Sequence, residues 1–71
     1  MEQAELLTRF TYHPPTEGQV THYEEIRYLA KTFAEVIDLR CPESREKSLA
    51  FTALEEAVMW ANAAIARRSN V

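Results

Sequence analysis

Apolar residues recur at helical spacing along the middle of the chain. Successive members of this stripe are separated by four, three and four residues, which places them on one face of an α-helix. They are Ile26, Ala30, Phe33 and Ile37, with Leu29 and Val36 widening the stripe. The pattern predicts a helix over about residues 21–40. Thr21 and Glu24 have the Thr-x-x-Glu spacing of a capping box, so we expect the helix to begin at Thr21.

A second apolar stripe predicts another long helix, over about residues 42–67. Its members are again three and four residues apart: Phe51, Leu54, Val58, Ala61 and Ile65. Pro42 suits the first turn of a helix, because its fixed φ is helical and its missing N–H would have no partner there. Seven of the ten alanines lie from Ala50 onward, so we expect other segments to contact this helix on more than one side.

The first twenty residues have the pattern of an arm. Residues 4–8 can form one helical turn, but the segment that ends in Pro14-Pro15 must be extended, because each Pro disfavours the helical conformation of the residue before it. Residues 16–19 then form a turn around the one glycine. The ring of Phe10 can either anchor this arm or stack on a base, and we expect it to anchor the arm. We expect Trp60 to be covered either by the arm or by another subunit.

Together these patterns predict an all-α fold, with an arm of residues 1–20 and an antiparallel two-helix hairpin in a single domain of residues 1–71. The single Gly argues against β-hairpins, which need turn residues at regular spacing. A chain of 71 residues encloses little core, and its single Cys cannot form an internal disulfide. We therefore expect a homo-oligomer.

The charge of the chain limits its partners. Eight basic and eleven acidic residues give a net charge of −3, which repels a nucleic-acid backbone, so we expect no DNA binding. Residues 57–71 contain Arg67 and Arg68 and no acid, so an anion site would have to be local. The first seven residues lack the apolar core of a signal peptide, and no apolar segment approaches the about 18 residues of a membrane span. These features favour a cytosolic protein without membrane contact.

Residues that could carry chemistry do not combine into a catalytic or metal-binding set. His22 and Glu25, with His13 and Glu17 nearby, lack the close Cys or His pairing of a zinc site. Cys41 stands before a helix without a second cysteine or a base, and we interpret it as a buried small hydrophobe. The sequence therefore predicts a protein that is not an enzyme and that uses neither a metal nor a cofactor.

Candidate binding residues are found in the arm and on the first long helix. Tyr12 and His13 combine a ring with polar atoms, so they can either pin the arm to the helices or contact a ligand such as a base. Arg27 and Lys31 are four residues apart and share a helix face. Each can either pair with an acid three or four residues away or bind an anion.

Three segments of the chain are distinctive: Phe10-Thr11-Tyr12-His13-Pro14-Pro15, Cys41-Pro42-Glu43-Ser44-Arg45-Glu46 and Leu54-Glu55-Glu56-Ala57-Val58-Met59-Trp60-Ala61-Asn62-Ala63-Ala64-Ile65-Ala66-Arg67. They resemble the small phage anti-CBASS sponge proteins, which share a helical hairpin domain with a phage anti-Thoeris protein. The resemblance implies a protein that sequesters cyclic oligonucleotide second messengers without degrading them, in the cytoplasm of the infected bacterium. It also implies a hexamer, with cyclic dinucleotide sites between paired protomers and cyclic trinucleotide sites shared by three subunits.

The resemblance also implies roles for individual residues. For a cyclic dinucleotide, it implies that Tyr12 stacks on a base and that Arg27 contacts a phosphate, with Lys31 on the same helix face. For a cyclic trinucleotide, it implies a phosphate contact from Arg67 or Arg68, with His13 as a further candidate.

The symmetry of the ligands suits such an assembly, because two-fold and three-fold axes can present one copy of each residue to each nucleotide. Two other functions stay open. One is a helical protein-interaction module in which Tyr12 only pins the arm. The other is a small nucleic-acid-binding regulator, which the acidic balance disfavours.

Overall fold

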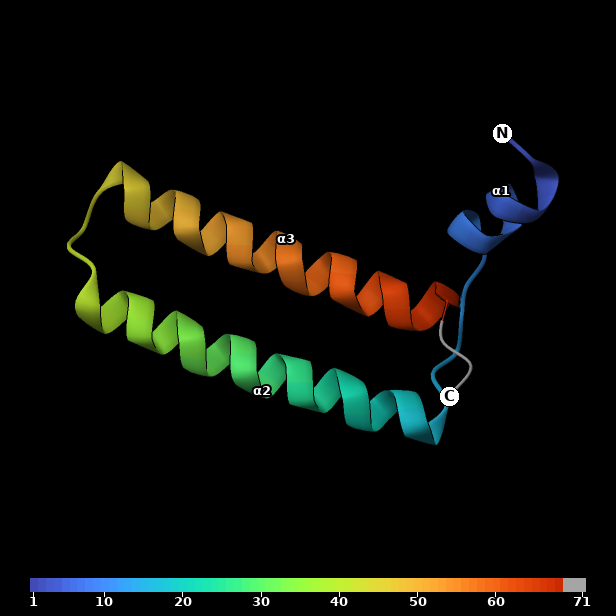
Figure 1. Cartoon of the computed structure of the whole chain (residues 1–71), viewed down its shortest axis with the longest axis horizontal. Helices are drawn as coiled ribbons and strands as arrows, with labels where there is room; N and C mark the ends of the chain where they lie inside the picture. The colour runs from blue at the N-terminus through green and yellow to red at the C-terminus, as the bar shows by residue number, and fades with distance from the viewer. Residues whose placement is uncertain (69–71) are drawn as a thin grey trace.

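The computed structural model describes residues 1–68; residues 69–71, the end of the predicted domain, lie outside the described residues. This range contains three helices and no strand: α1 (Gln3–Phe10), α2 (Glu17–Arg40) and α3 (Arg45–Arg68). Helices α2 and α3 lie side by side and antiparallel, and α1 lies at the end of the hairpin where α2 begins and α3 ends (Figure 1). The prediction of an all-helical chain is confirmed for the described residues.

Helix α2 begins four residues earlier than the capping pattern at Thr21 predicts. The Thr16 side chain accepts a hydrogen bond from the backbone N–H of Gln19 at 3.2 Å, and the Gln19 side chain accepts one from the Thr16 N–H at 3.1 Å. This capping box prevails because the Gln19 amide also donates to the Ile65 carbonyl of α3 at 3.2 Å. The expected turn around Gly18 is therefore wrong, and Gly18 lies in the first turn of α2.

Helix α3 begins three residues later than the Pro42 signal predicts. The Ser44 hydroxyl accepts a hydrogen bond from the backbone N–H of Lys47 at 3.1 Å and donates one to the Pro42 carbonyl at 3.0 Å. Serine is a preferred N-cap, so the helix starts after Ser44 and Pro42 stays in the link. Cys41 is exposed in this link. Its interpretation as a buried residue is wrong, because the chain turns away from the helices at this point.

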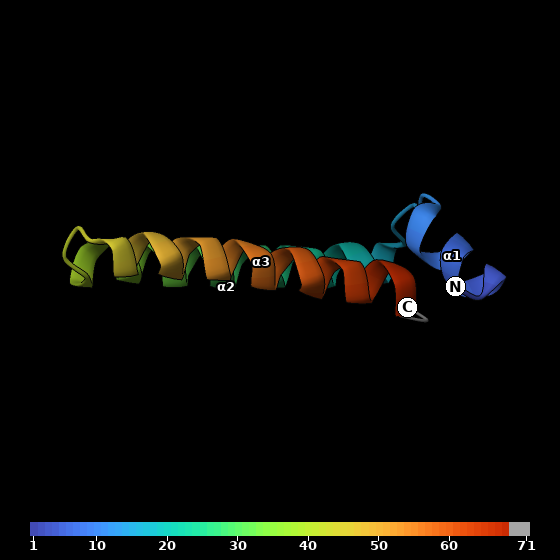
Figure 2. The same cartoon turned by 90° about the horizontal axis from the view of Figure 1, so that it is seen from above.

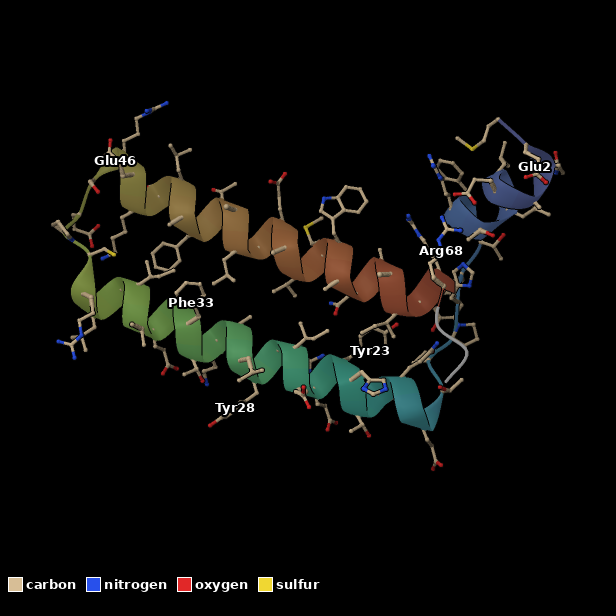
Figure 3. The ribbon with its side chains drawn as sticks, in the orientation of Figure 1. Glu2, Tyr23, Tyr28, Phe33, Glu46 and Arg68 are labelled. Atoms are coloured by element: carbon tan, nitrogen blue, oxygen red, sulfur yellow. The ribbon has the colours of Figure 1, made fainter. Side chains whose placement is uncertain are left out.

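The two long helices pack along the predicted stripes, and the stripe of α3 is covered more evenly than that of α2. All five members of the α3 stripe are half-buried, whereas on α2 Ile37 is buried, at 7% exposure. Phe33, Leu29 and Val36 stay exposed on α2. Tyr23 points toward α3 (Figure 3). A pair of helices can cover one face of each partner, so the rest of the wide α2 stripe has no neighbour within the described residues.

The hairpin is one layer thick. The Cα atoms of the chain, α1 included, extend over 46 × 29 × 13 Å, and the edge-on view shows α2 and α3 in a single layer (Figure 2). The radius of gyration is 15.3 Å, against about 11 Å for a compact domain of this length. Within residues 1–68, no helix is long and apolar enough to cross a membrane.

The turn between α2 and α3 is closed by a buried lysine. The Lys47 ammonium donates to the Asp38 carbonyl at 3.1 Å and pairs with the carboxylates of Asp38 at 3.1 Å and Glu43 at 2.5 Å. Its side chain is 5% exposed. The hydrogen bond to Glu43, together with Asp38, raises the pKa of Lys47, so the ammonium stays charged and all three of its N–H groups have partners.

Candidate functional site

A cavity lies between α1 and the last turns of α3. We call it the open-end cavity; it has a volume of about 530 Å³ and is open to solvent. Its lining residues are Arg9, Phe10, Trp60, Ala63, Ala64, Arg67 and Arg68. The two alanines leave room between the rings of Phe10 and Trp60. The cavity thus combines three guanidinium groups with two aromatic rings, the groups that bind phosphates and nucleobases.

A single carboxylate joins the arginines of the two walls. Glu5 accepts hydrogen bonds from Arg68, with Nη2 to Oε1 at 2.6 Å and Nη1 to Oε2 at 3.1 Å, and from Arg9 Nε at 2.9 Å. These bonds, the strongest of them from Arg68, lower the pKa of Glu5 to about 2. The same pairing raises the pKa of Arg68. The network is therefore fully charged at neutral pH.

The structure brings together two of the three residues predicted for a cyclic trinucleotide. Arg67 and Arg68 both line the open-end cavity, and Figure 3 shows Arg68 where α1 meets the end of α3. His13 lies apart from the lining residues; its Nε2 is 2.7 Å from the Thr8 carbonyl oxygen, where the ring links α1 to the extended segment. Within residues 1–68, Arg67 forms no ion pair.

The aromatic rings of the open-end cavity are not buried. Phe10 is 78% exposed and Trp60 is 67% exposed. The expectation that Phe10 anchors the arm to the helices is therefore wrong for this chain, because the ion pairs of Glu5 hold α1 and leave the ring free. The arm faces Trp60 across the cavity without covering it.

A second cavity holds the cations predicted for a cyclic dinucleotide. This α2–α3 groove has a volume of about 390 Å³. Arg27 and Lys31 form its α2 rim, Glu55 and Met59 belong to its α3 rim, and its floor is apolar. Neither Arg27 nor Lys31 forms an ion pair within the described residues, so the alternative in which each pairs with a neighbouring acid is wrong.

Tyr12 lies apart from this groove. It belongs to the extended segment between α1 and α2, its side chain is 80% exposed, and it is not among the residues that line the groove. One copy of the chain therefore brings Arg27 and Lys31 together and leaves Tyr12 outside.

Sequence reasoning missed Arg9 and Glu5. The residues 4–8 were expected to form one turn, but α1 extends to Phe10 and places Glu5 and Arg9 one turn apart. Their i, i+4 spacing of opposite charges is a helix signal that could have extended the prediction. No sequence signal joins Glu5 to Arg68, because 63 residues separate them.

The described residues offer little for metal or acid–base chemistry. Within residues 1–68 there is no group of three or more His, Cys, Asp or Glu side chains that could hold a metal ion. The strongly shifted acid, Glu5, is held as a carboxylate rather than as a proton donor. What the two cavities can do chemically is bind an anion that also carries flat apolar groups.

Comparisons with known proteins identify the family of this chain. The model of the Acb2/Tad1 hairpin domain matches residues 2–66. No curated protein and no solved structure matches the chain. The matched segment includes α1 and α2 completely and α3 up to its last two described residues. The protein therefore belongs to the Acb2/Tad1 hairpin domain family, the anti-CBASS and anti-Thoeris sponge family that its sequence resembles.

Proposed function

We propose that the protein is a non-enzymatic sponge that binds cyclic di- and trinucleotide second messengers and so blocks CBASS immunity in the infected bacterium. The observation that carries this proposal is the presence of two cavities in which cations lie beside apolar surface. Within residues 1–68, these cations either form no ion pair or share a single carboxylate. Membership of the Acb2/Tad1 hairpin family supports it. Sequestration requires tight binding alone, so no nucleophile, base or metal is needed.

The open-end cavity is the proposed cyclic trinucleotide site. Arg67 supplies a phosphate contact, because its guanidinium can fork onto two phosphate oxygens, and Arg68 lies beside it. The rings of Phe10 and Trp60 offer faces for a base. The His13 ring contacts the Thr8 carbonyl oxygen and does not line the cavity. In this proposal, His13 therefore contributes to the site only by its place in the arm.

The α2–α3 groove is the proposed cyclic dinucleotide site, completed by a second copy of the chain. Arg27 and Lys31 contact the phosphates, and Tyr12 of the paired copy stacks on a base. A two-fold axis then gives each half of the ligand the same contacts. Tyr12 is exposed and does not line the groove of its own chain, which favours this sharing.

An oligomer, a hexamer in the proposal, fits the packing of the hairpin. The one-layer shape leaves Leu29, Phe33 and Val36 exposed on α2, and an apolar groove of about 310 Å³ runs past Leu29 and Phe33 between the two helices. Exposed apolar surface of this kind is stabilised when another subunit covers it. Two-fold and three-fold contacts in one assembly would provide both kinds of ligand site.

Calorimetry with a panel of cyclic di- and trinucleotides tests the proposal. We expect Tyr12→Ala to weaken cyclic dinucleotide binding by at least about 30-fold, since stacking contributes about 1–3 kcal/mol per base and the ligand has two bases. Arg27→Glu should also weaken it, because the substitution puts a negative charge beside each phosphate. Arg67→Glu should weaken cyclic trinucleotide binding and leave dinucleotide binding unchanged. Recovery of intact nucleotide after heating the complex would support sequestration.

Arg40→Glu is the matched control, because it makes the same charge reversal at the far end of α2, away from both cavities. It should bind both ligands like the wild-type protein. The absence of heat with every nucleotide, together with a monomeric native mass, would contradict the proposal. Binding of a helical protein segment instead would then favour an interaction module, and hydrolysed nucleotide would contradict the non-enzymatic mechanism.

A further inference from the structure

Helix α1 is attached to the hairpin by charge more than by apolar packing. Within residues 1–68, extensive helix packing joins α2 to α3, whereas Leu6, Leu7 and Phe10 of α1 are all exposed. The side-chain hydrogen bonds that join α1 to α3 in this range are the two from Arg68 to Glu5. Figure 2 shows α1 at the end of the hairpin rather than over its face. The place of α1 therefore depends on Glu5.

This place matters because α1 forms one wall of the open-end cavity. Arg9 and Phe10 come from α1, and they face Trp60 and Arg67 of α3 across the cavity. Glu5 bonds the Nε of Arg9. The two Nη groups of Arg9 make no hydrogen bond within the described residues, so they are available to an anion in the cavity.

We propose that Glu5 is a positioning residue of this binding site: through Arg68 it holds α1 on α3, and so it sets Arg9 and Phe10 opposite Arg67 and Trp60. The ligand class is a cyclic oligonucleotide phosphate, so this proposal rests on the function proposed above. Glu5 acts through its two arginines and does not touch the ligand.

Glu5 can strengthen ligand binding because its carboxylate restricts the conformations of the long arginine side chains. A guanidinium on a solvated side chain samples many rotamers, and fixing it costs conformational entropy. A carboxylate that bonds both Nη groups removes much of this freedom before a ligand arrives. Glu5 cancels one of the three positive charges of Arg9, Arg67 and Arg68, which leaves a net charge of +2 around the cavity.

The first test compares Glu5→Gln with Glu2→Gln, a matched control that removes a charge just before α1. We measure amide exchange of α1 by NMR and the affinity for cyclic tri-AMP by calorimetry. Glu5→Gln should lose the exchange protection of α1 and bind cyclic tri-AMP about fivefold more weakly. Glu2→Gln should match the wild-type protein in both, because Glu2 makes no side-chain bond within the described residues.

A double-mutant cycle with Arg68→Gln separates positioning from a general loss of fold. If Glu5 acts through Arg68, Glu5→Gln added to Arg68→Gln should weaken binding little further than Arg68→Gln does. Tighter binding by Glu5→Gln would overturn the proposal, because it would mean that Glu5 competes with the ligand. Unchanged affinity would overturn it as well.

Amide exchange reports the attachment of α1 without a ligand, so it tests this proposal separately from the proposed function. Loss of α1 protection in Glu5→Gln, with no cyclic tri-AMP binding by the wild-type protein, would overturn the proposed cyclic trinucleotide site and support the attachment of α1 by Glu5. Full protection of α1 in Glu5→Gln would overturn that attachment whatever the ligand result.

Discussion

The two ends of the hairpin use basic residues in opposite ways. At the closed end, where the turn joins α2 to α3, Lys47 is buried and its ammonium has a carbonyl and two carboxylates as partners. At the open end, Arg67 and Arg68 lie beside a cavity that is open to solvent, and one carboxylate pairs with both Arg68 and Arg9. Residues of the same charge thus have different roles at the two ends. A cation whose N–H groups all have partners stabilises a turn, and a cation with only some of its N–H groups bonded can bind a ligand.

The position of each cation along its helix explains the difference. Lys47 follows the turn directly, and the short link brings Asp38 and Glu43 to the same point. The arginines end α3, where the carbonyl end of the helix dipole favours positive charge, and within residues 1–68 no turn joins α3 to another helix there. A chain with a net charge of −3 therefore keeps a locally positive surface.

The largest expected effect on stability comes from removing the buried apolar side chain beside the closed end. Ile37→Ala should lower the free energy of unfolding by about 2–5 kcal/mol, because it leaves a cavity at a well-packed site. Denaturant unfolding followed by circular dichroism measures this. Leu39→Ala is the control, since Leu39 is 74% exposed, and it should change stability by less than about 0.5 kcal/mol. A similar loss in both variants would mean that another subunit covers Leu39.

A smaller effect is expected from the buried cation itself. Lys47→Ala should lower the melting temperature by about 5 °C, because the turn loses the bonds to Asp38 and Glu43. Arg45→Ala changes a basic residue two positions away, outside the ion pairs of the described residues, and should melt like the wild-type protein. Cyclic tri-AMP binding should be unchanged in Lys47→Ala. Loss of binding in this variant would show that the two ends are not independent.

The smallest effect concerns the pH dependence of the open end. The pKa of Glu5 is about 2 in the folded chain, below its ordinary value of 4.5. A lowered pKa means that the ionised form stabilises the attachment of α1, fully above about pH 4.5 and progressively less as the pH falls toward 2. The NMR shifts of α1 amides should therefore stay constant from about pH 7 to 5 and change below about pH 4.5. Glu5→Gln should lack this transition, and its persistence there would assign it to another group.

Much of the fold follows from local patterns. The α3 stripe of three-and-four spacing identifies the face that packs on α2, because a helix repeats every 3.6 residues. The start of α2 does not follow from them. Thr16-x-x-Gln19 and Thr21-x-x-Glu24 both have capping spacing, and a contact with Ile65 in the other helix favours the first.

The candidate site is less accessible to sequence reasoning. Arg27 and Lys31 could be grouped by their helical spacing, and Arg67 and Arg68 by their place near the end of the described chain. Arg9 and Phe10 join Arg67 only because α1 lies at the end of α3. The α1 wall of the open-end cavity cannot be predicted from the spacing of residues along the chain, since it depends on where a separate helix docks.

The sequence by itself determined the helical fold and the family of this protein, because helical periodicity is local and the conspicuous segments around Tyr12 and Trp60 are contiguous. The tertiary structure decided which charges meet. It buried Lys47 in the turn, left Cys41 exposed, and joined Glu5 to Arg68 across 63 residues. The physical reason is that an ion pair needs two groups within a few ångströms, a condition that the path of the chain in space sets and that local spacing cannot.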